Sequence, residues 1–257
     1  MAGSIVTECS GEDSNVVWRY FNDPLLPFEP VVFDEKQLAQ RQLLAGHAGA
    51  GRGNTFYFTF HGQPLVLRHY RRGGLAQKLS KRHYIYTGLE RTRAMREFDM
   101  LVALCEQEFP VSRPYACRVV RRGPFYQASL VTHRLAGRTL GESLLDSADA
   151  EPGLATWEKI GEVIARLHAA GVFHADLNAH NIMLGGDDAV SLIDFDRARI
   201  RPLPVEDAAS DWCLSNIDRL QRSLIKIAAG QSDFSEGFAA LKQRWQETLT
   251  YSISPRS

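Results

Sequence analysis

The pattern of apolar and polar residues changes about halfway along the chain. In the first half, runs of aromatic and aliphatic residues bounded by glycine and proline predict strands at 55–60, 65–70, 118–120 and 125–135. Apolar residues at helical spacing predict a helix over 92–108 between the two strand pairs. In the second half the helical period dominates, which predicts helices at 157–171, 211–229 and 238–249.

Turn and capping residues set the boundaries of these elements. Residues 1–30 are polar and then proline-rich, which predicts an irregular N-terminal extension. Asp34 is placed to cap a short helix over 35–44, and Gly171 is placed to end a helix in the left-handed conformation. We therefore expect an α+β fold with an extension at 1–30, a strand-rich lobe at 31–133 and a mainly helical lobe at 134–257.

Composition narrows the class of protein. The 257 residues are enough for two lobes with their own cores, and 30 basic residues balance 30 acidic ones, so no overall charge points to nucleic acid. The four cysteines form no CxxC pair, which favours reduced thiols in a cytosolic protein. No signal sequence or long apolar run is present, so we expect the chain neither to span a membrane nor to be exported.

One stretch of the second lobe has the layout of a phosphoryl-transfer site. Residues 174–196 read HADLNAHNIMLGGDDAVSLIDFD, in which Asp176, Asn181 and Asp194 follow the order of a protein-kinase catalytic loop and metal site. Asp176 is predicted to accept the proton of an acceptor hydroxyl. Asn181 and Asp194 are predicted to hold Mg²⁺, which takes only one or two carboxylates besides substrate phosphates. With the element order, this stretch predicts a bilobal protein-kinase-like fold that binds ATP between its lobes.

The first lobe supplies candidates for contacts with ATP. A glycine-rich loop precedes the first strand pair, and its backbone amides could approach phosphates at Gly49, Gly51 and Gly53. Arg68 falls where kinases carry a strand lysine, and Glu97 on the following helix is its predicted partner. The alternative is that both are solvated surface residues and that another base, such as Lys78, contacts the phosphates.

Four other polar residues of the 174–196 stretch have less defined roles. His174 is predicted to order the loop, since Asp176 already takes the proton-accepting role. Asn178 and His180 are candidates for acceptor contacts, with a structural role in the loop as the alternative. Asp196 replaces the usual glycine of Asp-Phe-Gly and is predicted either to pair with Arg197 or Arg199 or to touch the metal.

The link between Arg68 and Arg96 is strongly basic. It holds nine Lys or Arg residues and one acid, Glu90, with aromatic and aliphatic residues interleaved. A solvated face is one interpretation. The other is a surface for lipid phosphates or an anionic membrane leaflet, formed by Arg71, Arg72, Lys78, Lys81 and Arg82. RNA binding is disfavoured by the neutral total charge and the lack of an RNA-binding module.

Several strings are more specific than the general kinase pattern. The chain resembles the bacterial 3-deoxy-D-manno-octulosonic acid (Kdo) kinases, of the lipopolysaccharide-kinase branch of the protein-kinase-like fold. The resemblance covers about residues 30–230 and rests on GRGNT at 51–55, VLRHYRRGG at 66–74, HADLNAHN at 174–181 and LIDFDR at 192–197. It implies that Arg68 and Asp196 are features of the family. It also implies Asp176 as the base and Asn181 and Asp194 as metal ligands.

The resemblance carries a specific expectation about the reaction. Such enzymes transfer the γ-phosphate of ATP to the 4-hydroxyl of the Kdo sugar on a lipid A precursor, peripherally bound at the cytoplasmic face of the inner membrane. The same residues could serve another small-molecule kinase, acting on heptose, an aminoglycoside or choline, and Arg68 with Asp196 would also suit a pseudokinase-like binding module. Protein substrates are disfavoured because no Ala-Pro-Glu follows Asp194. No obligate protein partner is evident from the sequence.

Overall fold

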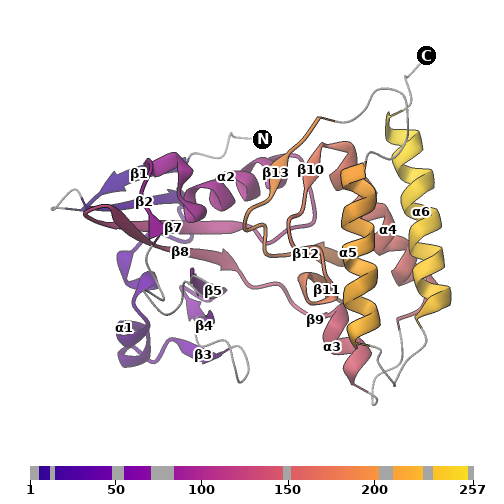
Figure 1. The fold of residues 1–257 in the computed structure, drawn as a ribbon. Helices are drawn as coiled ribbons and strands as arrows, with labels where there is room; N and C mark the ends of the chain where they lie inside the picture. The colour runs from indigo at the N-terminus through magenta and orange to yellow at the C-terminus, as the bar shows by residue number, and fades with distance from the viewer. Residues whose placement is uncertain are drawn as a thin grey trace. The chain divides into compact units, whose positions relative to one another are not determined.

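The computed structural model describes residues 6–11, 15–47, 55–70, 84–146, 152–202, 211–227 and 234–253. Contacts divide the chain into two compact units, Met1–Gln107 with Ser112–Arg134 and Glu108–Val111 with Leu135–Ser257. Residues 108–111 belong to the second unit because the Leu192 N–H donates to the Pro110 carbonyl oxygen and Val111 bridges to Leu192. The first unit is strand-rich and the second mainly helical, in agreement with the predicted α+β class (Figure 1).

Within the described residues, the first unit is built on an eight-stranded antiparallel sheet. Its strands run in the order β1-β2-β7-β8-β5-β4-β3, and β6 also pairs with β8. The bounds are β1 Val6–Ser10, β2 Val16–Phe21, β3 Leu44–His47, β4 Thr55–Phe60, β5 Gln63–His69, β6 Tyr84–Ile85, β7 Pro114–Arg122 and β8 Phe125–His133. The helical elements are η1 Pro30–Phe33, α1 Glu35–Gln40, η3 Leu89–Arg91 and α2 Arg93–Glu106.

Neighbouring residues of β7 show how the two faces of this sheet are covered. Cys117 points to α2, where its Sγ lies 3.4 Å from the Met95 Sδ. The guanidinium of Arg118, on the opposite face, lies 5.1 Å from the ring centre of Phe33 in η1. Since successive side chains of a strand alternate between faces, α2 covers one face and the η1–α1 segment covers part of the other (Figure 1).

The structure corrects two predictions for the N-terminal segment. The segment predicted as an irregular extension contains two strands, β1 at residues 6–10 and β2 at residues 16–21. They form because β2 pairs with β7, and because Tyr20 of β2 stacks on Phe28 with ring centres 4.1 Å apart. The helix predicted over 35–44 ends at Gln40. Asp34 caps its start as predicted, by accepting from the N–H groups of Lys36 and Gln37, but Leu44 already pairs with Phe58 of β4.

The described part of the second unit contains four α-helices and short strands. The helices are α3 Leu140–Leu145, α4 Leu154–Ala169, α5 Asp211–Ile227 and α6 Ser235–Ile253, with the 3₁₀ turn η4 at Ala179–Asn181. The strands are β9 Arg138–Thr139, β10 Val172–Phe173, β11 Ile182–Leu184, β12 Val190–Leu192 and β13 Arg199–Ile200. β11 pairs with β12 and β9, and β10 pairs with β13.

Close packing of α4 on α6 forms the core of this unit. A Cβ atom on Gly161 of α4 would lie 2.3 Å from the Leu241 carbonyl oxygen of α6, so only glycine allows this approach. Trp245 of α6 is completely buried in the same core. The sequence pattern predicted α4 and α6 but not α3, although Thr139 and Glu142 form a capping box at its start.

Candidate active site

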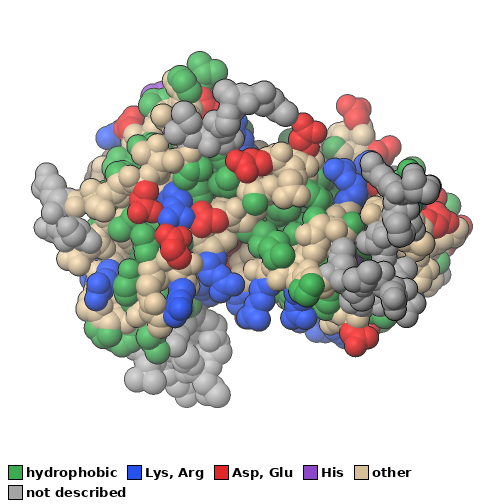
Figure 2. All heavy atoms as spheres, turned by 90° about the horizontal axis from the view of Figure 1, so that it is seen from above, with side chains coloured by type: hydrophobic (Ala, Val, Ile, Leu, Met, Phe, Trp, Pro, Cys, Tyr) green, Lys and Arg blue, Asp and Glu red, His purple; other side chains and the backbone are tan. Residues whose placement is uncertain are grey.

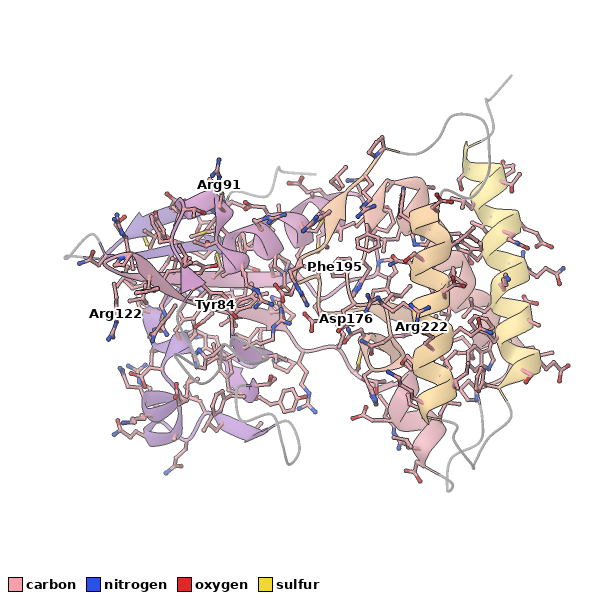
Figure 3. The ribbon with its side chains drawn as sticks, in the orientation of Figure 1. Tyr84, Arg91, Arg122, Asp176, Phe195 and Arg222 are labelled. Carbon is pink, nitrogen blue, oxygen red and sulfur yellow. The ribbon has the colours of Figure 1, made fainter. Side chains whose placement is uncertain are left out.

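The loop after β10 presents the Asp176 carboxylate to solvent while fixing its backbone (Figure 3). The Asp176 carbonyl oxygen accepts hydrogen bonds from the Asn181 side-chain amide at 2.8 Å and the Asn178 amide at 3.0 Å. Its side chain is 49 % exposed, and one carboxylate oxygen lies 3.6 Å from an Arg219 guanidinium nitrogen. The predicted base is thus held by its main chain and has a reactive group that an acceptor can reach.

The β11–β12 hairpin brings Asp194 next to Asn181. Ile182 pairs with Leu192 in this hairpin, and the Ile193 N–H donates to the Asn181 carbonyl oxygen at 3.0 Å. Asp194 follows with a φ of 63°, a left-handed conformation that a short polar side chain tolerates better than most. The hairpin therefore makes the two residues of the predicted metal pair neighbours in the fold.

The donor atoms present suit Mg²⁺ in a nucleotide complex. Because the Asn181 amide nitrogen is bonded to Asp176, its Oδ1 is the atom that can bind a metal, together with the Asp194 carboxylate. Among the described residues there is no group of three or more His, Cys, Asp or Glu side chains that could hold a metal. An amide oxygen and a carboxylate are the oxygen donors that suit a hard cation which also coordinates substrate phosphates. The Arg197 Nε lies 3.9 Å from an Asp196 carboxylate oxygen, one of the two contacts predicted for Asp196.

His174 orders the loop from inside the protein, as predicted. Its Nε2 lies 3.0 Å from the Ile193 carbonyl oxygen and its Nδ1 lies 3.2 Å from the Asp176 N–H. A carbonyl needs a donor and an N–H needs an acceptor, so the ring is neutral with its proton on Nε2. Burial lowers the pKa of His174, which keeps it in this form. Phe195 packs against the same ring, with centres 4.8 Å apart.

A buried polar chain behind the loop was not predicted. The Asn216 side chain of α5 bonds both backbone groups of His174 and lies 3.3 Å from the His168 Nε2. The Trp245 indole N–H donates to the His168 Nδ1 at 3.0 Å. Burial lowers the pKa of His168 to about 4, so it is neutral. No spacing links residues of α4, α5 and α6, which is why no sequence signal revealed this chain.

Asn178 and His180 are engaged within the second unit. The Asn178 Oδ1 accepts from the His180 N–H at 2.9 Å, which caps η4. The His180 ring packs on Gly141 of α3, where an added Cβ would lie 2.5 Å from the ring Nδ1. These contacts support the structural alternative for both residues. Contact of either with the acceptor stays a prediction.

In the first unit, the predicted pair of Arg68 and Glu97 is present. Arg68 on β5 donates to the Glu97 carboxylate of α2, and the Tyr70 hydroxyl donates to the other oxygen of that carboxylate. Glu97 is only 2 % exposed, so the interpretation of a solvated surface residue is wrong for it. Tyr70 was not predicted. Its ring also lies about equally close to the Arg68 and Arg93 guanidinium groups, at 5.1 and 5.2 Å.

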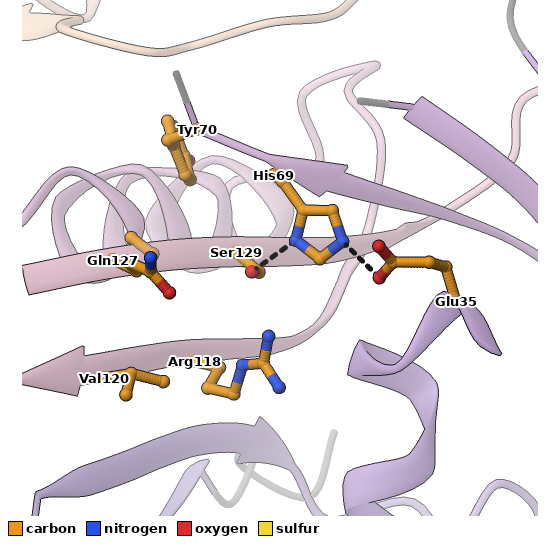
Figure 4. A pocket seen from close by; sticks show the side chains of 8 residues that line it. Glu35, His69, Tyr70, Arg118, Val120, Gln127 and Ser129 are labelled. Atoms are coloured by element: carbon orange, nitrogen blue, oxygen red, sulfur yellow. Dashed lines mark hydrogen bonds and ion pairs between the residues drawn. The ribbon is translucent and has the colours of Figure 1, made fainter. Parts of the chain in front are cut away.

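Next to Arg68 on β5, His69 lines a small polar cavity of about 70 Å³. The His69 ring bridges the Ser129 hydroxyl at 2.7 Å and the Glu35 carboxylate at 3.2 Å (Figure 4). It thereby ties β5 to β8 and to α1. Since β5 also carries Arg68, these contacts help to fix the strand from which the ion pair is built.

The remaining predicted contacts lie outside the described residues. They are the loop glycines Gly49, Gly51 and Gly53 and the basic residues Arg71, Arg72, Lys78, Lys81 and Arg82. On the face of the molecule drawn in Figure 2, acidic and basic side chains are interspersed, as the balanced composition leads one to expect. No helix among the described residues is long and apolar enough to cross a membrane.

The geometry defines a class of enzyme. A half-exposed loop aspartate hydrogen-bonded through its backbone to an asparagine, and a strand arginine paired with a helix glutamate, match the residue pattern of protein-kinase-like phosphotransferases. Comparison with known families makes the assignment more particular. The chain belongs to the lipopolysaccharide kinase (Kdo/WaaP) family, whose family model matches residues 36–240.

Curated relatives of similar length agree with this family. A 3-deoxy-D-manno-octulosonic acid kinase of Stenotrophomonas maltophilia is 38 % identical over 229 residues, covering 84 % of this chain and 88 % of its own. An enzyme of the same name from Vibrio parahaemolyticus is 39 % identical, covering 83 % and 86 %. One from Xanthomonas campestris is 40 % identical, covering 71 % and 70 %. The resemblance seen in the short strings thus extends over most of the chain.

Proposed function

We propose that this protein transfers the γ-phosphoryl group of ATP to the 4-hydroxyl of the Kdo sugar on a Kdo-lipid A precursor. The observation that carries the proposal is the exposed Asp176 carboxylate, held beside Asn181 and Asp194 in a chain that belongs to the Kdo/WaaP family. The names of the curated relatives support this acceptor over a heptose, an aminoglycoside or choline.

The chemistry follows from the placement of a few groups. Asp176 accepts the proton of the acceptor hydroxyl as its oxygen attacks the γ-phosphorus, and the leaving group is ADP. Asn181 and Asp194 would hold Mg²⁺, which when bound offsets charge on the phosphate oxygens. Arg68, oriented by Glu97, contacts the phosphates of ATP as a planar donor in place of the usual lysine.

We also propose that the enzyme works at the cytoplasmic face of the inner membrane as a peripheral protein. The support is the sequence of the basic link, with Arg71, Arg72, Lys78, Lys81 and Arg82, and the lipid-linked nature of the proposed acceptor. Because surface attraction is screened within roughly 8 Å at physiological salt, binding to anionic liposomes should fall as salt rises. Replacement of these five residues by Gln should weaken vesicle binding and activity on the lipid-linked acceptor more than activity on a soluble Kdo glycoside. Equal losses on both acceptors would contradict membrane docking.

The acceptor is tested directly with Mg-ATP and a panel of substrates. The panel contains a Kdo-lipid A precursor, a heptosylated core, an aminoglycoside and a generic protein. We expect phosphate transfer to the first only, at the 4-hydroxyl of its Kdo sugar, as determined by mass spectrometry and NMR of the product. Asp176→Asn serves as the inactive control. Preferred transfer to another member of the panel would overturn the proposed function.

A further inference from the structure

The second unit contains a wide, open pocket that includes the predicted base. The pocket has a volume of about 420 Å³ and is lined by Phe173, Ala175, Asp176, Arg197, Arg199 and Arg219. Its lining thus brings three guanidinium groups together with a single carboxylate. The accepting hydroxyl must enter this space to reach Asp176, so the pocket is where part of the acceptor lies during transfer.

Each arginine of this pocket is placed by a different element. Arg199 lies on β13, where it pairs with Phe173 of β10. Arg219 lies on α5, one turn beyond Asn216, the residue that bonds the backbone of His174. Arg197 and Arg199 are two residues apart in the sequence, and the tertiary fold brings Arg219 of α5 to the same pocket.

Arg197 is held in an unusual backbone conformation. Its φ is 65°, a left-handed conformation that is unfavourable for a long side chain. The turn is closed by a hydrogen bond from the Ala198 N–H to the Phe195 carbonyl oxygen at 2.9 Å. Phe195 is buried, so the turn is anchored to the core. Strained backbone that directs a charged side chain to a pocket beside a catalytic group is a feature common at functional sites.

The charges in the pocket are not balanced by its own residues. Arg219 lies 3.6 Å from Asp176, a loose ion pair between two half-exposed side chains. The exposed Arg197 lies 3.9 Å from Asp196, whose side chain is mostly buried. The contact of Arg219 is with one oxygen of the Asp176 carboxylate, which leaves the other oxygen able to accept a proton from the acceptor. An anionic group on the incoming ligand would therefore meet an excess of planar donors, the geometry that binds a carboxylate in a bidentate manner.

We propose that Arg197, Arg199 and Arg219 bind the carboxylate of the acceptor sugar acid and so place its 4-hydroxyl at Asp176. This inference rests on the proposed function, in which the acceptor is a Kdo sugar. The carboxylate and the 4-hydroxyl of that sugar lie close together on one ring, as do the arginines and Asp176 in one pocket. The arginines thereby select a sugar acid over a neutral sugar. Phosphates of the lipid portion are a second source of anionic charge, which the experiment must separate.

The test combines two variants with three acceptors. Arg197→Gln and Arg199→Gln are compared with the wild type, whereas Arg219 is left unchanged because it contacts the base. The acceptors are the Kdo-lipid A precursor, the same molecule with its Kdo carboxylate converted to a carboxamide, and a dephosphorylated form. Arg244→Gln on α6 is the matched control, because Arg244 forms an ion pair with Glu158 of α4 between half-exposed side chains. Thermal unfolding of every variant checks the fold.

We expect each variant to raise the KM for the natural acceptor about tenfold to a hundredfold, because the loss of one charge-assisted hydrogen bond typically weakens binding by such a factor. The KM for ATP should stay the same. The carboxamide should raise the wild-type KM by a similar factor, and variant and carboxamide together should add little more, since they remove the same contact. The dephosphorylated acceptor should respond to the variants as the natural one does.

Other results overturn the inference and leave the proposed function intact. Fully additive effects of variant and carboxamide would show that the arginines do not bind the carboxylate. Loss of the variants' effect on the dephosphorylated acceptor would assign them to a lipid phosphate, and a raised KM for ATP would assign them to the nucleotide. By contrast, failure of the wild type to phosphorylate the natural acceptor at all would contradict the proposed function itself.

Discussion

Asn216 of α5 bonds both backbone groups of His174, since its amide nitrogen donates to the carbonyl oxygen at 2.9 Å and its amide oxygen accepts from the N–H at 3.2 Å. An amide is the side chain that can do both at once. This contact joins α5 to the start of the catalytic loop, two residues before Asp176. The position of the predicted base therefore depends on Asn216, which lies 42 residues after His174 in the chain.

Replacing Asn216 by Leu tests this dependence. The buried backbone groups of His174 would lose their partner, at about 1–3 kcal/mol for each unsatisfied group, and the loop would lose its anchor. We expect a lower unfolding temperature and a lower kcat, measured by thermal unfolding and by phosphate transfer. Gln221→Leu, at an exposed position of the same helix, is the control for the substitution itself. Wild-type stability and turnover in Asn216→Leu would show that the contact is dispensable.

Asp176→Asn should remove nearly all turnover and leave Mg-ATP binding almost unchanged, because the base acts on the acceptor and not on the nucleotide. The two side chains have the same shape, so the backbone bonds from Asn178 and Asn181 should persist. Turnover and nucleotide affinity are measured separately, and Asp187→Asn in the β11–β12 turn is the matched control. Substantial turnover in Asp176→Asn would place the base elsewhere.

Asp194→Asn should weaken nucleotide binding that depends on Mg²⁺. Asn also tolerates the left-handed backbone found at this position, so the substitution removes charge and not conformation. A titration of Mg²⁺ at fixed ATP should show a higher metal requirement than in the wild type. An unchanged requirement would rule out Asp194 as a metal ligand.

The pair of Arg68 and Glu97 calls for a double-mutant cycle. Arg68→Ala removes a charged hydrogen-bond donor from a buried carboxylate, so we expect a loss of about 1–3 kcal/mol in stability and a raised ATP requirement. Arg68→Lys should rescue only partly, since a point charge does not reproduce a planar donor. The exposed pair of Arg41 and Glu29 serves as a control with a coupling of about 0–1 kcal/mol. Additive losses at Arg68 and Glu97 would argue against the interaction.

The buried histidines make stability fall in mild acid. Burial lowers the pKa of His168 to about 4 and also lowers that of His174, whereas both titrate near 6.5 in the unfolded chain. Below pH of about 6.5 the unfolded state therefore binds more protons than the folded state does. As the pH falls further, each histidine lowers the unfolding free energy by up to about 1.4 kcal/mol per pH unit, until the pH reaches its folded-state pKa. Above about pH 7 neither contributes to the pH dependence.

Urea unfolding between pH 5 and 8 measures this slope. His168→Gln removes one titrating group, so the loss of stability below pH of about 6.5 should be shallower than in the wild type. Gln221→Asn, at an exposed position of α5 without a titrating group, is the control and should leave the slope unchanged. An identical slope in His168→Gln and the wild type would contradict the assignment.

The candidate base and metal ligands could be predicted from the sequence because they lie close together in it. Asp176, Asn181 and Asp194 stand within one loop and one hairpin, and local hydrogen bonds such as that from the Ile193 N–H to Asn181 bring them together. The partner of Arg68 was also predictable, because the helix after a strand pair packs on that sheet and presents one face. Helices with strong periodicity, such as α2 and α4, were predicted for the same reason.

Only the tertiary structure decided which distant residues meet. The sequence by itself determined the α+β class, the order of the catalytic groups and their resemblance to one kinase family, since these depend on local spacing. It could not show that β1 and β2 join the sheet, because β2 is stabilised by its pairing with β7, about a hundred residues away. Nor could it show the chain from Trp245 to His168 to Asn216, or the arginines converging on Asp176. Those contacts follow from burial and packing between elements, which no local pattern of residues encodes.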